Sequence, residues 1–367
     1  MGRNLFQQSY HKDLEKVYRN FDGVVLDNIV SEINDLQNYL ENLKQKIDNN
    51  TLILISYHNH TWEPILILAS KLGLRNNVGV QNWMDKEDVE NILKLSGFEV
   101  IKTQKRFFGL TIVTTAKPKH KKKIKKENYS VSVIIPARNE AGNISKIIPD
   151  IPKFGKWQEI IFIEGHSGDQ TWQIINKEIS KYANGKIKVR AYKQNGKGKA
   201  DAVKLGFEKA KGDILMIYDA DRTVSANDLA KFYNAIASGL GDFINGSRLV
   251  YPMENDAMQT LNKMGNKFFG LVFTWVLGQR FKDTLCGTKA MWRHDLIKYR
   301  SDYNKYLKID PFGDFALIFT AIKHNMKVVE IPVRYKERVY GSTNINRFYH
   351  GLLLCKMAIL AFFEFKT

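Results

Sequence analysis

Short apolar runs alternate with amphipathic stretches along the first third of the chain, which predicts a mixed α/β fold. The predicted strands are 24–26, 51–57, 97–100 and 110–115. The predicted helices are 29–47, 64–72 and 85–95. Asp85 stands at the start of the last helix, where a carboxylate can cap the first turn.

From residue 131 onward the alternation becomes more regular. The predicted strands here are 131–136, 159–164, 187–192 and 214–218. Because these runs are apolar almost throughout, both faces of each strand must be covered, as in a parallel sheet between two layers of helices. Ligands of such sheets bind at the carboxyl ends of the strands. Polar clusters follow the strands at that end, so we expect a ligand site there.

Two aspartates, Asp219 and Asp221, follow the last of these strands. Residues i and i+2 of a strand point to the same side, so both carboxylates can aim at one point where the strand becomes a loop. Such oxygen ligands suit a hard divalent cation that also holds a diphosphate. A polar turn after a strand is the plainer alternative.

Composition limits the range of functions. The 367 residues give room for two domains, and 56 Lys and Arg against 38 Asp and Glu give a net charge of +18. This charge favours an acidic partner such as a sugar nucleotide, an anionic membrane or nucleic acid. The two cysteines, Cys286 and Cys355, lack metal-ligand spacing and indicate a reducing, cytoplasmic compartment. The amino terminus has no apolar signal core, and no run is long enough to predict a spanning helix.

The stretch KPKHKKKIKK, residues 117–126, is almost entirely cationic. A run of this kind is typical of a solvated linker, so we place a domain boundary at 117–128. Contact with anionic lipid, at about 1 kcal/mol per cation, is the alternative. Nucleic acid is not expected as a partner, because no aromatic-rich recognition module accompanies the run.

The segments FDGVVLDNIVSEINDLQNYLENLKQKI, TLILISYHNHTWEPI and QNWMDKEDVENILKLSGFEV resemble the C-terminal half of class I S-adenosylmethionine-dependent methyltransferases. In that family the cofactor lies on a Gly-rich turn after the first strand. No such turn precedes Phe21, and there is no room for three strands before Val24. We therefore expect residues 1–116 to be a partial Rossmann-like α/β domain without methyl transfer. It is a remnant, a scaffold or part of a site completed by another chain.

Four motifs of the second half occur in order: VSVIIPARNEAGNI, FIEGHSGDQT, NGKGKADAV and ILMIYDAD. They resemble the family-two glycosyltransferases of GT-A fold. FINGSR and EIPVRYKERVYGST resemble the dolichyl-phosphate mannose synthase-like branch. The resemblance implies a GT-A nucleotide-diphospho-sugar transferase domain over 129–343. It further implies inverting transfer of one sugar from a nucleotide-sugar donor, with Mg²⁺ or Mn²⁺ as cofactor.

The same resemblance assigns roles on the donor side. The nucleotide-binding turn comprises Pro136, Ala137, Arg138 and Glu140, with Glu140 near the ribose or base. Glu164 stands where the family usually has an aspartate that contacts the base; a carboxylate at a helix start is the alternative.

Toward the diphosphate, the resemblance assigns Asp219 and Ala220 together with Lys197 or Lys199, for which a solvated surface lysine is the alternative. Asp219 and Asp221 are expected to hold the metal. Thr223 stands where relatives can carry a further metal contact, and we expect its ligation to be weaker or through water.

On the acceptor side, Asp314 matches the family's acidic residue. A hydroxyl acceptor needs such a base, whereas a phosphate is already an anion and needs none. Asp310 is the competing carboxylate, and helix capping is the alternative for both. Arg338 begins a segment similar to the family's Arg-x-x-Gly-x-Ser, and its planar fork suits phosphate oxygens. Asn344 replaces a Lys that is common in relatives using polyprenyl phosphate, which weakens that acceptor assignment without excluding it.

Two apolar stretches, 268–277 and 351–363, are too short to span a bilayer. They fit interfacial helices, with core packing as the alternative. We expect residues 344–367 to form an amphipathic helix that holds the protein to the cytoplasmic face of an anionic membrane. The sequence leaves the oligomeric state open.

Two other functions are alternatives to the transfer of a single sugar. A processive polysaccharide synthase would need spanning helices and a Gln-x-x-Arg-Trp motif, and 279–281 reads Gln-Arg-Phe. A non-catalytic adaptor made of two decayed enzyme halves is opposed by the intact Asp219 and Asp221 pair. Cys286 is expected to be a packed residue, not a nucleophile.

Overall fold

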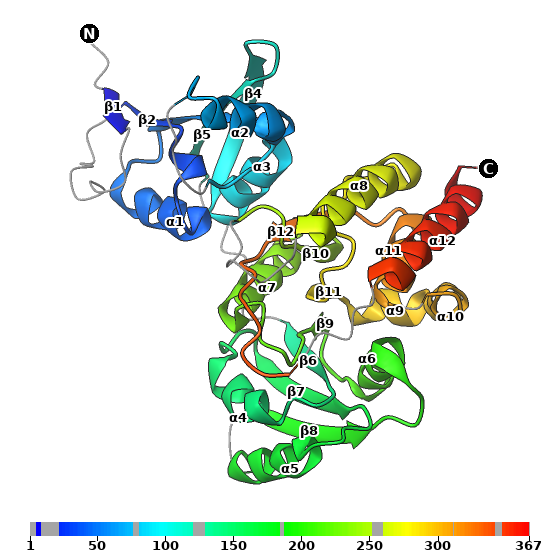
Figure 1. Cartoon of the computed structure of the whole chain (residues 1–367). Helices are drawn as coiled ribbons and strands as arrows, with labels where there is room; N and C mark the ends of the chain where they lie inside the picture. Colours follow the sequence, from blue (N-terminus) through cyan, green and yellow to red (C-terminus); the bar gives the residue numbers. More distant parts are fainter. Residues whose placement is uncertain are drawn as a thin grey trace. The chain divides into compact units, whose positions relative to one another are not determined.

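The computed structural model describes residues 5–8, 22–75, 81–119, 129–183, 187–251, 260–310, 312–341 and 347–366. The chain forms two compact units (Figure 1). Unit 1 comprises Met1–Ile124 with Val250–Pro252, and unit 2 comprises Lys125–Leu249 with Met253–Thr367. Most of the predicted Lys-rich linker and the boundary predicted at 343/344 lie outside the described residues.

Unit 1 is built on a 5-stranded sheet in the order β1-β2-β3-β5-β4. Its strands are β1 (Leu5–Gln8), β2 (Gly23–Asp27), β3 (Leu52–His58), β4 (Phe98–Arg106) and β5 (Thr111–Pro118). The first three are parallel, and β5 runs antiparallel to both β3 and β4. Strand β1 was not among the predicted strands. Strand β5 extends into the stretch expected to be linker, because Lys117 is still paired with Glu99 of β4.

The helices of unit 1 largely follow the predicted pattern. They are η2 (Ile29–Ser31), α1 (Leu36–Lys46), η3 (His60–Trp62), α2 (Glu63–Lys71) and α3 (Lys86–Leu95). The single helix expected over 29–47 is wrong at its start. Asn28 adopts a left-handed conformation and leads into a 3-10 turn, and the α-helix begins only where Asp35 accepts the backbone N–H of Asn38.

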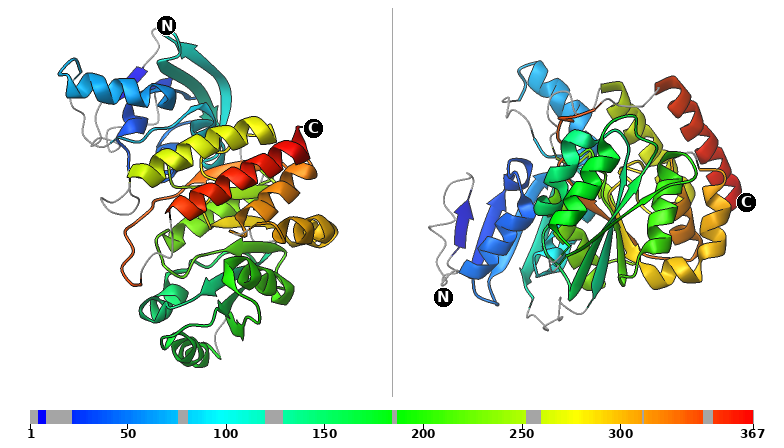
Figure 2. Two further views of the ribbon diagram at one scale, coloured as in Figure 1. Left: turned by 45° about the vertical axis from the view of Figure 1, so that its right-hand side comes forward. Right: turned by 90° about the horizontal axis from the view of Figure 1, so that it is seen from below.

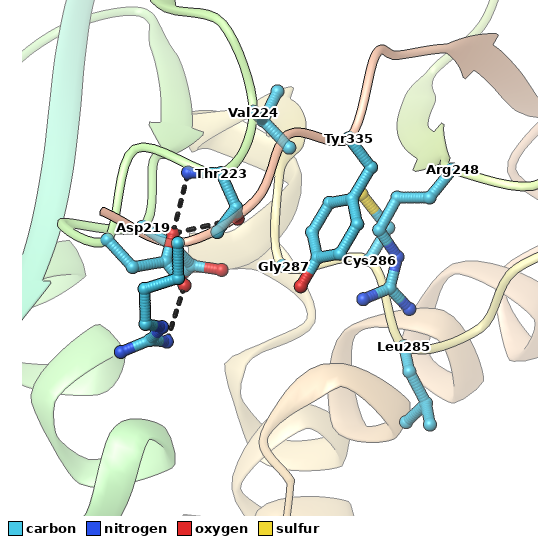
Figure 3. A pocket seen from close by; sticks show the side chains of 10 residues that line it. Asp219, Thr223, Val224, Arg248, Leu285, Cys286, Gly287 and Tyr335 are labelled. Carbon is cyan, nitrogen blue, oxygen red and sulfur yellow. Dashed lines mark hydrogen bonds and ion pairs between the residues drawn. The ribbon is translucent and has the colours of Figure 1, made fainter. Parts of the chain in front are cut away.

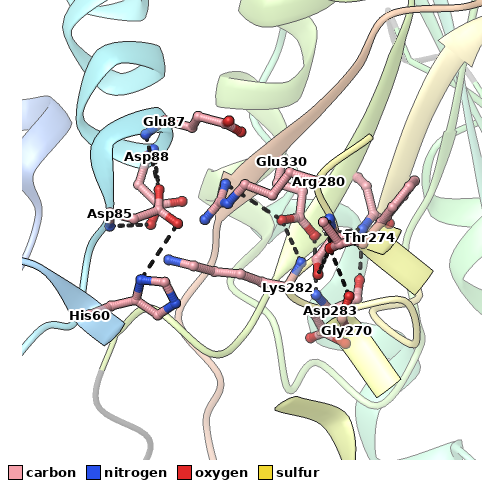
Figure 4. A network of polar contacts seen from close by, with 12 residues as sticks. His60, Asp85, Glu87, Asp88, Gly270, Thr274, Arg280, Lys282, Asp283 and Glu330 are labelled. Carbon is pink, nitrogen blue, oxygen red and sulfur yellow. Dashed lines mark hydrogen bonds and ion pairs between the residues drawn. The ribbon is translucent and has the colours of Figure 1, made fainter. Parts of the chain in front are cut away.

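The predicted cap of α3 is confirmed. The Asp85 carboxylate accepts the backbone N–H groups of Glu87 and Asp88, and the Asp88 side chain accepts that of Asp85 (Figure 4). This reciprocal arrangement satisfies donors that have no partner inside the helix. The apolar side of α3 then completes the core of unit 1, where Val89, Ile92 and Leu93 are buried and α3 packs against β4 and β5.

Unit 2 contains a 7-stranded sheet in the order β12-β10-β11-β9-β6-β7-β8. Its strands are β6 (Ser130–Ala137), β7 (Trp157–Glu164), β8 (Lys188–Lys193), β9 (Ile214–Ile217), β10 (Phe243–Ser247), β11 (Lys289–Trp292) and β12 (Val328–Pro332). Strands β9, β6, β7 and β8 are parallel, as predicted. Strand β11 runs antiparallel to its neighbours β9 and β10. Its amino end therefore lies at the sheet edge where β9 ends.

Helices cover this sheet on both faces. They are η4 (Ala226–Asp228), α4 (Ala141–Asp150), α5 (Thr171–Lys181), α6 (Gly198–Lys209), α7 (Leu229–Ala237), α8 (Thr260–Leu277), α9 (Arg293–Lys298), α10 (Arg300–Leu307), α11 (Asp314–Lys323) and α12 (Arg347–Phe365). Ile134 of β6 belongs to the core shared with α6 and α11, while its neighbours Val133 and Ile135 are buried as well. Since successive strand residues face opposite ways, both faces are covered.

Helices α8 and α12 contain the two apolar stretches and lie side by side (Figure 2). One side of each helix joins the core, through Phe273 of α8 and Met357 of α12. The other side is exposed, and Trp275 stacks on Phe362 at 5.8 Å between ring centroids. Each of the two apolar stretches therefore packs into the core on one side and is exposed on the other. No helix in the described part of the chain is long and apolar enough to cross a bilayer.

Candidate active site

The loop that follows β9 carries both predicted metal ligands. The backbone N–H of Tyr218 donates to the carbonyl of Ile134 in β6 at 3.0 Å, which continues the β6–β9 pairing. The Tyr218 hydroxyl donates to the carbonyl of Val224 at 3.0 Å. Between these points Arg222 adopts a left-handed φ of 57° and contacts Asp150 on α4. The loop is therefore fixed at both ends and in the middle.

Asp219 and Asp221 line one pocket of about 170 Å³ at the carboxyl end of β9 (Figure 3). The other walls come from segments far apart in the sequence: Thr223, Val224, Arg248, Leu285, Cys286, Gly287, Tyr335 and Arg338. Two carboxylates and two guanidinium groups thus face a common space. The prediction that Asp219 and Asp221 meet at one place agrees with this arrangement.

Asp221 is held by neighbours on both of its oxygens. Its Oδ1 accepts the backbone N–H of Thr223 at 3.0 Å and the Thr223 hydroxyl at 2.8 Å. Its Oδ2 lies 2.7 Å from Nη2 of Arg338. The other arm of that guanidinium lies 3.2 Å from Oε1 of Glu140. Arg338 therefore bridges the predicted nucleotide-binding turn and the predicted metal ligand.

Asp219 is paired with a lysine. Nζ of Lys199, in the first turn of α6, lies 2.6 Å from Oδ1 of Asp219. Burial alone would raise the pKa of Asp219, but Lys199, with Lys289 and Arg248 further away, holds it below its usual range. Of the two candidate lysines, Lys199 contacts the pocket-lining Asp219, whereas Lys197 is exposed at the start of α6.

Arg248, which was not among the predicted site residues, forms the far wall of the pocket. Its Nε and Nη2 lie 2.6 and 2.8 Å from the carboxylate of buried Asp283. The backbone N–H of Asp283 in turn donates to Glu330 at 3.1 Å (Figure 4). A bidentate pair of this kind fixes the guanidinium plane. The FINGSR motif, whose last residue is Arg248, was the available signal.

The predicted nucleotide turn follows β6. Pro136 and Ala137 are the last residues of the strand, Arg138 is exposed, and Glu140 is buried. The Glu140 carboxylate accepts Nδ2 of Asn143 at 2.7 Å. Burial raises the pKa of Glu140 to about 7, against the opposing effects of Asn143 and Arg338.

Glu164 ends β7 and is buried. Its Oε1 accepts the backbone N–H of Ser167 at 2.5 Å, so it braces the turn before α5. Ala220, between the two aspartates, is buried, and its place in the donor site rests on the resemblance alone. Cys286 is also buried, and burial raises the pKa of its thiol to about 12. Cys286 is thus a packed residue, as expected, and that it is not a nucleophile stays a prediction.

The two acceptor-side carboxylates have different surroundings. Asp310 accepts the backbone N–H groups of Phe312 and Ala316, each at 2.8 Å, which is a capping role at the start of α11. Asp314 lies in the first turn of α11, and its Oδ1 is 2.9 Å from Nζ of Lys289. Lys289 was missed in the sequence. A lysine at the head of the otherwise apolar strand Lys289–Trp292 was the available signal.

The protein supplies only some of the ligands that a divalent cation at this site would need. Asp219 and Asp221 supply the hard oxygen ligands that Mg²⁺ and Mn²⁺ prefer. Among the described residues, no three His, Cys, Asp or Glu side chains gather as a metal cluster. A cation bound here would therefore complete its shell with oxygens of a bound diphosphate and of water, as Mg²⁺ commonly does.

The sequence profile of Glycosyl transferase family 2 matches residues 132–319. Among curated proteins, the chain is 30% identical over 221 residues to a dolichol-phosphate mannosyltransferase of Pyrococcus furiosus, covering 59% of each protein. It is 28% identical to glycosyltransferase AglJ of Haloferax volcanii, covering 60% of this chain and 68% of the relative. A UDP-N-acetylglucosamine–dolichyl-phosphate N-acetylglucosaminyltransferase of Methanococcus voltae is 27% identical, covering 62% and 96%.

Two solved structures were also found to be similar. One is the mannosyltransferase PcManGT from Pyrobaculum calidifontis in complex with GDP-Man and Mn²⁺, with 16% identity, a TM-score of 0.40, and coverage of 61% of this chain and 60% of that one. The other is glucosyl-3-phosphoglycerate synthase from Mycobacterium tuberculosis, with 15% identity, a TM-score of 0.44, and coverage of 64% and 80%. The profile match and the observed mixed sheet confirm the expected α/β, GT-A glycosyltransferase fold of unit 2.

Proposed function

Because the chain belongs to glycosyl transferase family 2, we propose that it moves one sugar from a nucleoside-diphosphate donor to a polyprenyl-type lipid phosphate, with a divalent cation and with inversion. The observation that carries the proposal is the pocket at the end of β9. There Asp219 and Asp221 face Arg248 and Arg338, with Lys199 beside Asp219. Carboxylates for a cation and cations for phosphates are what a diphosphate donor requires.

The reaction needs few proton transfers. A phosphate oxygen of the acceptor attacks the anomeric carbon, the bond from that carbon to the donor diphosphate breaks, and the nucleoside diphosphate leaves. A bound cation supplies charge neutralisation at the leaving group. We assign Arg338 and Lys199 to the same diphosphate oxygens. No base is required for a phosphate acceptor, whereas a hydroxyl acceptor would need a carboxylate such as Asp314.

On the donor side, we assign Glu140 and Arg138 to the nucleoside, following Pro136 and Ala137 at the end of β6. Glu164 is the candidate contact for the base. This assignment is supported by position: Arg338 links the buried Glu140 of the turn to the proposed metal ligand Asp221.

The lipid acceptor is supported by two observations. Several curated relatives bear names that state transfer to dolichyl phosphate. Helices α8 and α12 expose apolar side chains next to each other, including Trp275 and Phe363, each 63% exposed. We propose that this surface lies against an anionic membrane, with the cytoplasmic face as the expected side.

A donor and acceptor screen tests the proposal. The full chain is incubated with UDP- and GDP-sugars and Mn²⁺, with either a polyprenyl phosphate or the matching polyprenol as acceptor. With polyprenyl phosphate, we expect release of nucleoside diphosphate and formation of a lipid that carries the sugar on its phosphate. With polyprenol, we expect neither. Transfer to the polyprenol alone would show that the acceptor is an alcohol and not a phosphate. No release of nucleoside diphosphate with any pair of donor and acceptor would contradict the proposed function. Asp221→Asn controls for contaminating activity.

For unit 1 we propose a scaffold role. The resemblance to half of a methyltransferase stays a prediction, and residues 9–22, which follow β1, contain no glycine. A Gly-rich turn for S-adenosylmethionine is therefore missing after this strand. We expect calorimetry to detect no binding of that cofactor by the full chain tighter than about 100 μM, roughly 5.5 kcal/mol. Tighter binding, or methyl transfer, would contradict the scaffold role.

A further inference from the structure

Lys289 is a lysine in an unusual place. Its side chain is 1% exposed at the head of β11, in the middle of the sheet of unit 2. Taking an ammonium group out of water costs several kcal/mol unless charges and hydrogen bonds compensate. Two partners do so here: Asp314 Oδ1 at 2.9 Å and the backbone carbonyl of Cys286. The lysine thus ties α11 to the loop before β11.

That loop forms part of the pocket wall. A Cβ added to Gly287 would lie 2.1 Å from Oδ2 of Asp219 and 2.2 Å from Nζ of Lys199. The backbone at Gly287 therefore lies directly against the Asp219–Lys199 pair. On its other side, Cys286 Sγ would lie 2.5 Å from a Cβ added to Gly246 of β10. The loop is closely packed on both sides, so a shift of the Cys286 carbonyl would move the backbone that packs against Asp219.

We propose that Asp314 is a positioning residue, which acts through Lys289 to hold the loop Cys286–Gly287 in place against Asp219. In this role its carboxylate takes no proton. The proposal rests on the proposed function, because only a phosphate acceptor makes a base unnecessary. It gives Asp314 a purpose in such a reaction: without it, Lys289 would be a buried, uncompensated charge.

The central test is a double variant, Asp314→Asn with Lys289→Gln, which removes both charges of the buried pair. Asp314→Asn leaves the Lys289 charge buried, and Lys289→Gln leaves the Asp314 charge. In the double variant the Gln amide retains two N–H donors, one for the Cys286 carbonyl and one for the Asn oxygen. Lys289→Arg keeps both charge and donors and serves as the conservative rescue. The three readouts are thermal unfolding without metal, binding of Mn²⁺ alone by electron paramagnetic resonance, and turnover.

We expect each single variant to unfold at a lower temperature and to bind Mn²⁺ about tenfold more weakly, with the double variant recovering most of both losses. Turnover should follow the same order, and Lys289→Arg should exceed Lys289→Gln. A double variant with restored Mn²⁺ binding but no more turnover than Asp314→Asn would overturn the proposal, because the carboxylate itself would then react. Single variants with unchanged Mn²⁺ binding would overturn it too.

A matched control loses a buried ion pair elsewhere. Arg190 of β8 contacts the fully buried Glu159 of β7, away from the pocket lining. Arg190→Met should lower the unfolding temperature and leave Mn²⁺ affinity unchanged. Because metal binding and unfolding need no acceptor, these two readouts decide the positioning role of Asp314 even if no lipid phosphate proves to be a substrate.

Discussion

Arg338 and Asp221 are 117 positions apart in the sequence, yet Nη2 of the arginine lies 2.7 Å from Oδ2 of the aspartate. The arginine precedes α12 and the aspartate follows β9. The same guanidinium also reaches Glu140. In the free protein, a cation from the C-terminal segment therefore already occupies one of the two proposed metal ligands. A metal ion must compete with Arg338 for the Asp221 carboxylate, and this competition leads to the first prediction.

Replacing Arg338 with Met should separate metal binding from turnover. Mn²⁺ alone should bind more tightly, by a few-fold, since an ion pair in this partly exposed setting is worth about 1 kcal/mol. Turnover should nevertheless fall by a hundredfold or more, roughly the effect of losing one well-placed charge on a leaving phosphate. Mn²⁺ titration and nucleoside diphosphate release measure the two effects.

Arg334→Met is the control for loss of a nearby positive charge outside the pocket lining. It should leave Mn²⁺ affinity as it is. Weaker Mn²⁺ binding in Arg338→Met would show that the arginine supports the aspartate pair and does not compete for it.

Removing a metal ligand gives the second prediction. Asp221→Asn should lower turnover by about a hundredfold or more, since the cation contributes several kcal/mol to the stability of the leaving group. Chelation of the wild-type protein should have a similar effect that added Mn²⁺ reverses. Asp213→Asn, at the other end of the same β9 segment, is the matched control and should keep its activity. Full turnover of Asp221→Asn would rule out the assigned role.

Much of unit 2 could be predicted because its signals are local. Apolar runs predicted the strands β6, β7 and β9, and the i, i+2 spacing predicted Asp219 and Asp221 on one side of a strand end. The start of α1 was harder, since 29–47 has helical spacing throughout, and only the left-handed Asn28 and the cap at Asp35 show where the helix begins.

The partners of the site could not be predicted, because they depend on topology. Lys289 meets Asp314 only because β11 runs antiparallel between β9 and β10, which no local pattern in a four-residue strand reveals. Similarly, the apolar content of α8 and α12 was evident, but which side of each helix joins the core depends on how the helices pack. Likewise, Lys199 contacts Asp219 and Lys197 does not because of the way in which α6 begins at Gly198, which the sequence does not reveal.

The buried carboxyl of Glu140 leads to a prediction about pH. Its pKa rises from 4.5 to about 7 on folding, mainly through burial. Between these values the folded state binds more protons than the unfolded state, so the free energy of unfolding should fall as pH rises through this range. Glu140→Gln should reduce that fall. Denaturant titrations at about pH 5 and about pH 8, without metal, measure it.

Asp310, whose pKa is raised to about 6 by burial, gives a slope of the same sign that should remain in Glu140→Gln. Glu208→Gln removes a carboxylate with an exposed side chain on α6 and should leave the wild-type slope. An unchanged slope in Glu140→Gln would mean that Glu140 is ionised in the folded protein, held so by Arg338.

The exposed side of α8 and α12 leads to the last prediction. Truncation before α12 is unsuitable as a test, because Leu354, Met357 and Ala361 belong to the core of unit 2. Substituting exposed side chains avoids this damage. Replacing Leu271, Trp275, Ile359 and Phe363, which are 58 to 70% exposed, with Ser should keep the fold.

The wild-type chain should float with anionic vesicles at low salt, and the quadruple variant should not. Burying four such side chains gives several kcal/mol at about 25 cal/mol per Å², part of which immobilisation offsets. The cations of 117–126 add a salt-dependent attraction, so wild-type flotation should weaken as salt rises. Ile297→Ser, at a side chain 55% exposed on α9, is the matched control and should still float. If the wild-type chain does not float with the vesicles, the proposed membrane-binding surface is wrong. An unchanged Mn²⁺ affinity of the quadruple variant would confirm that its pocket is intact.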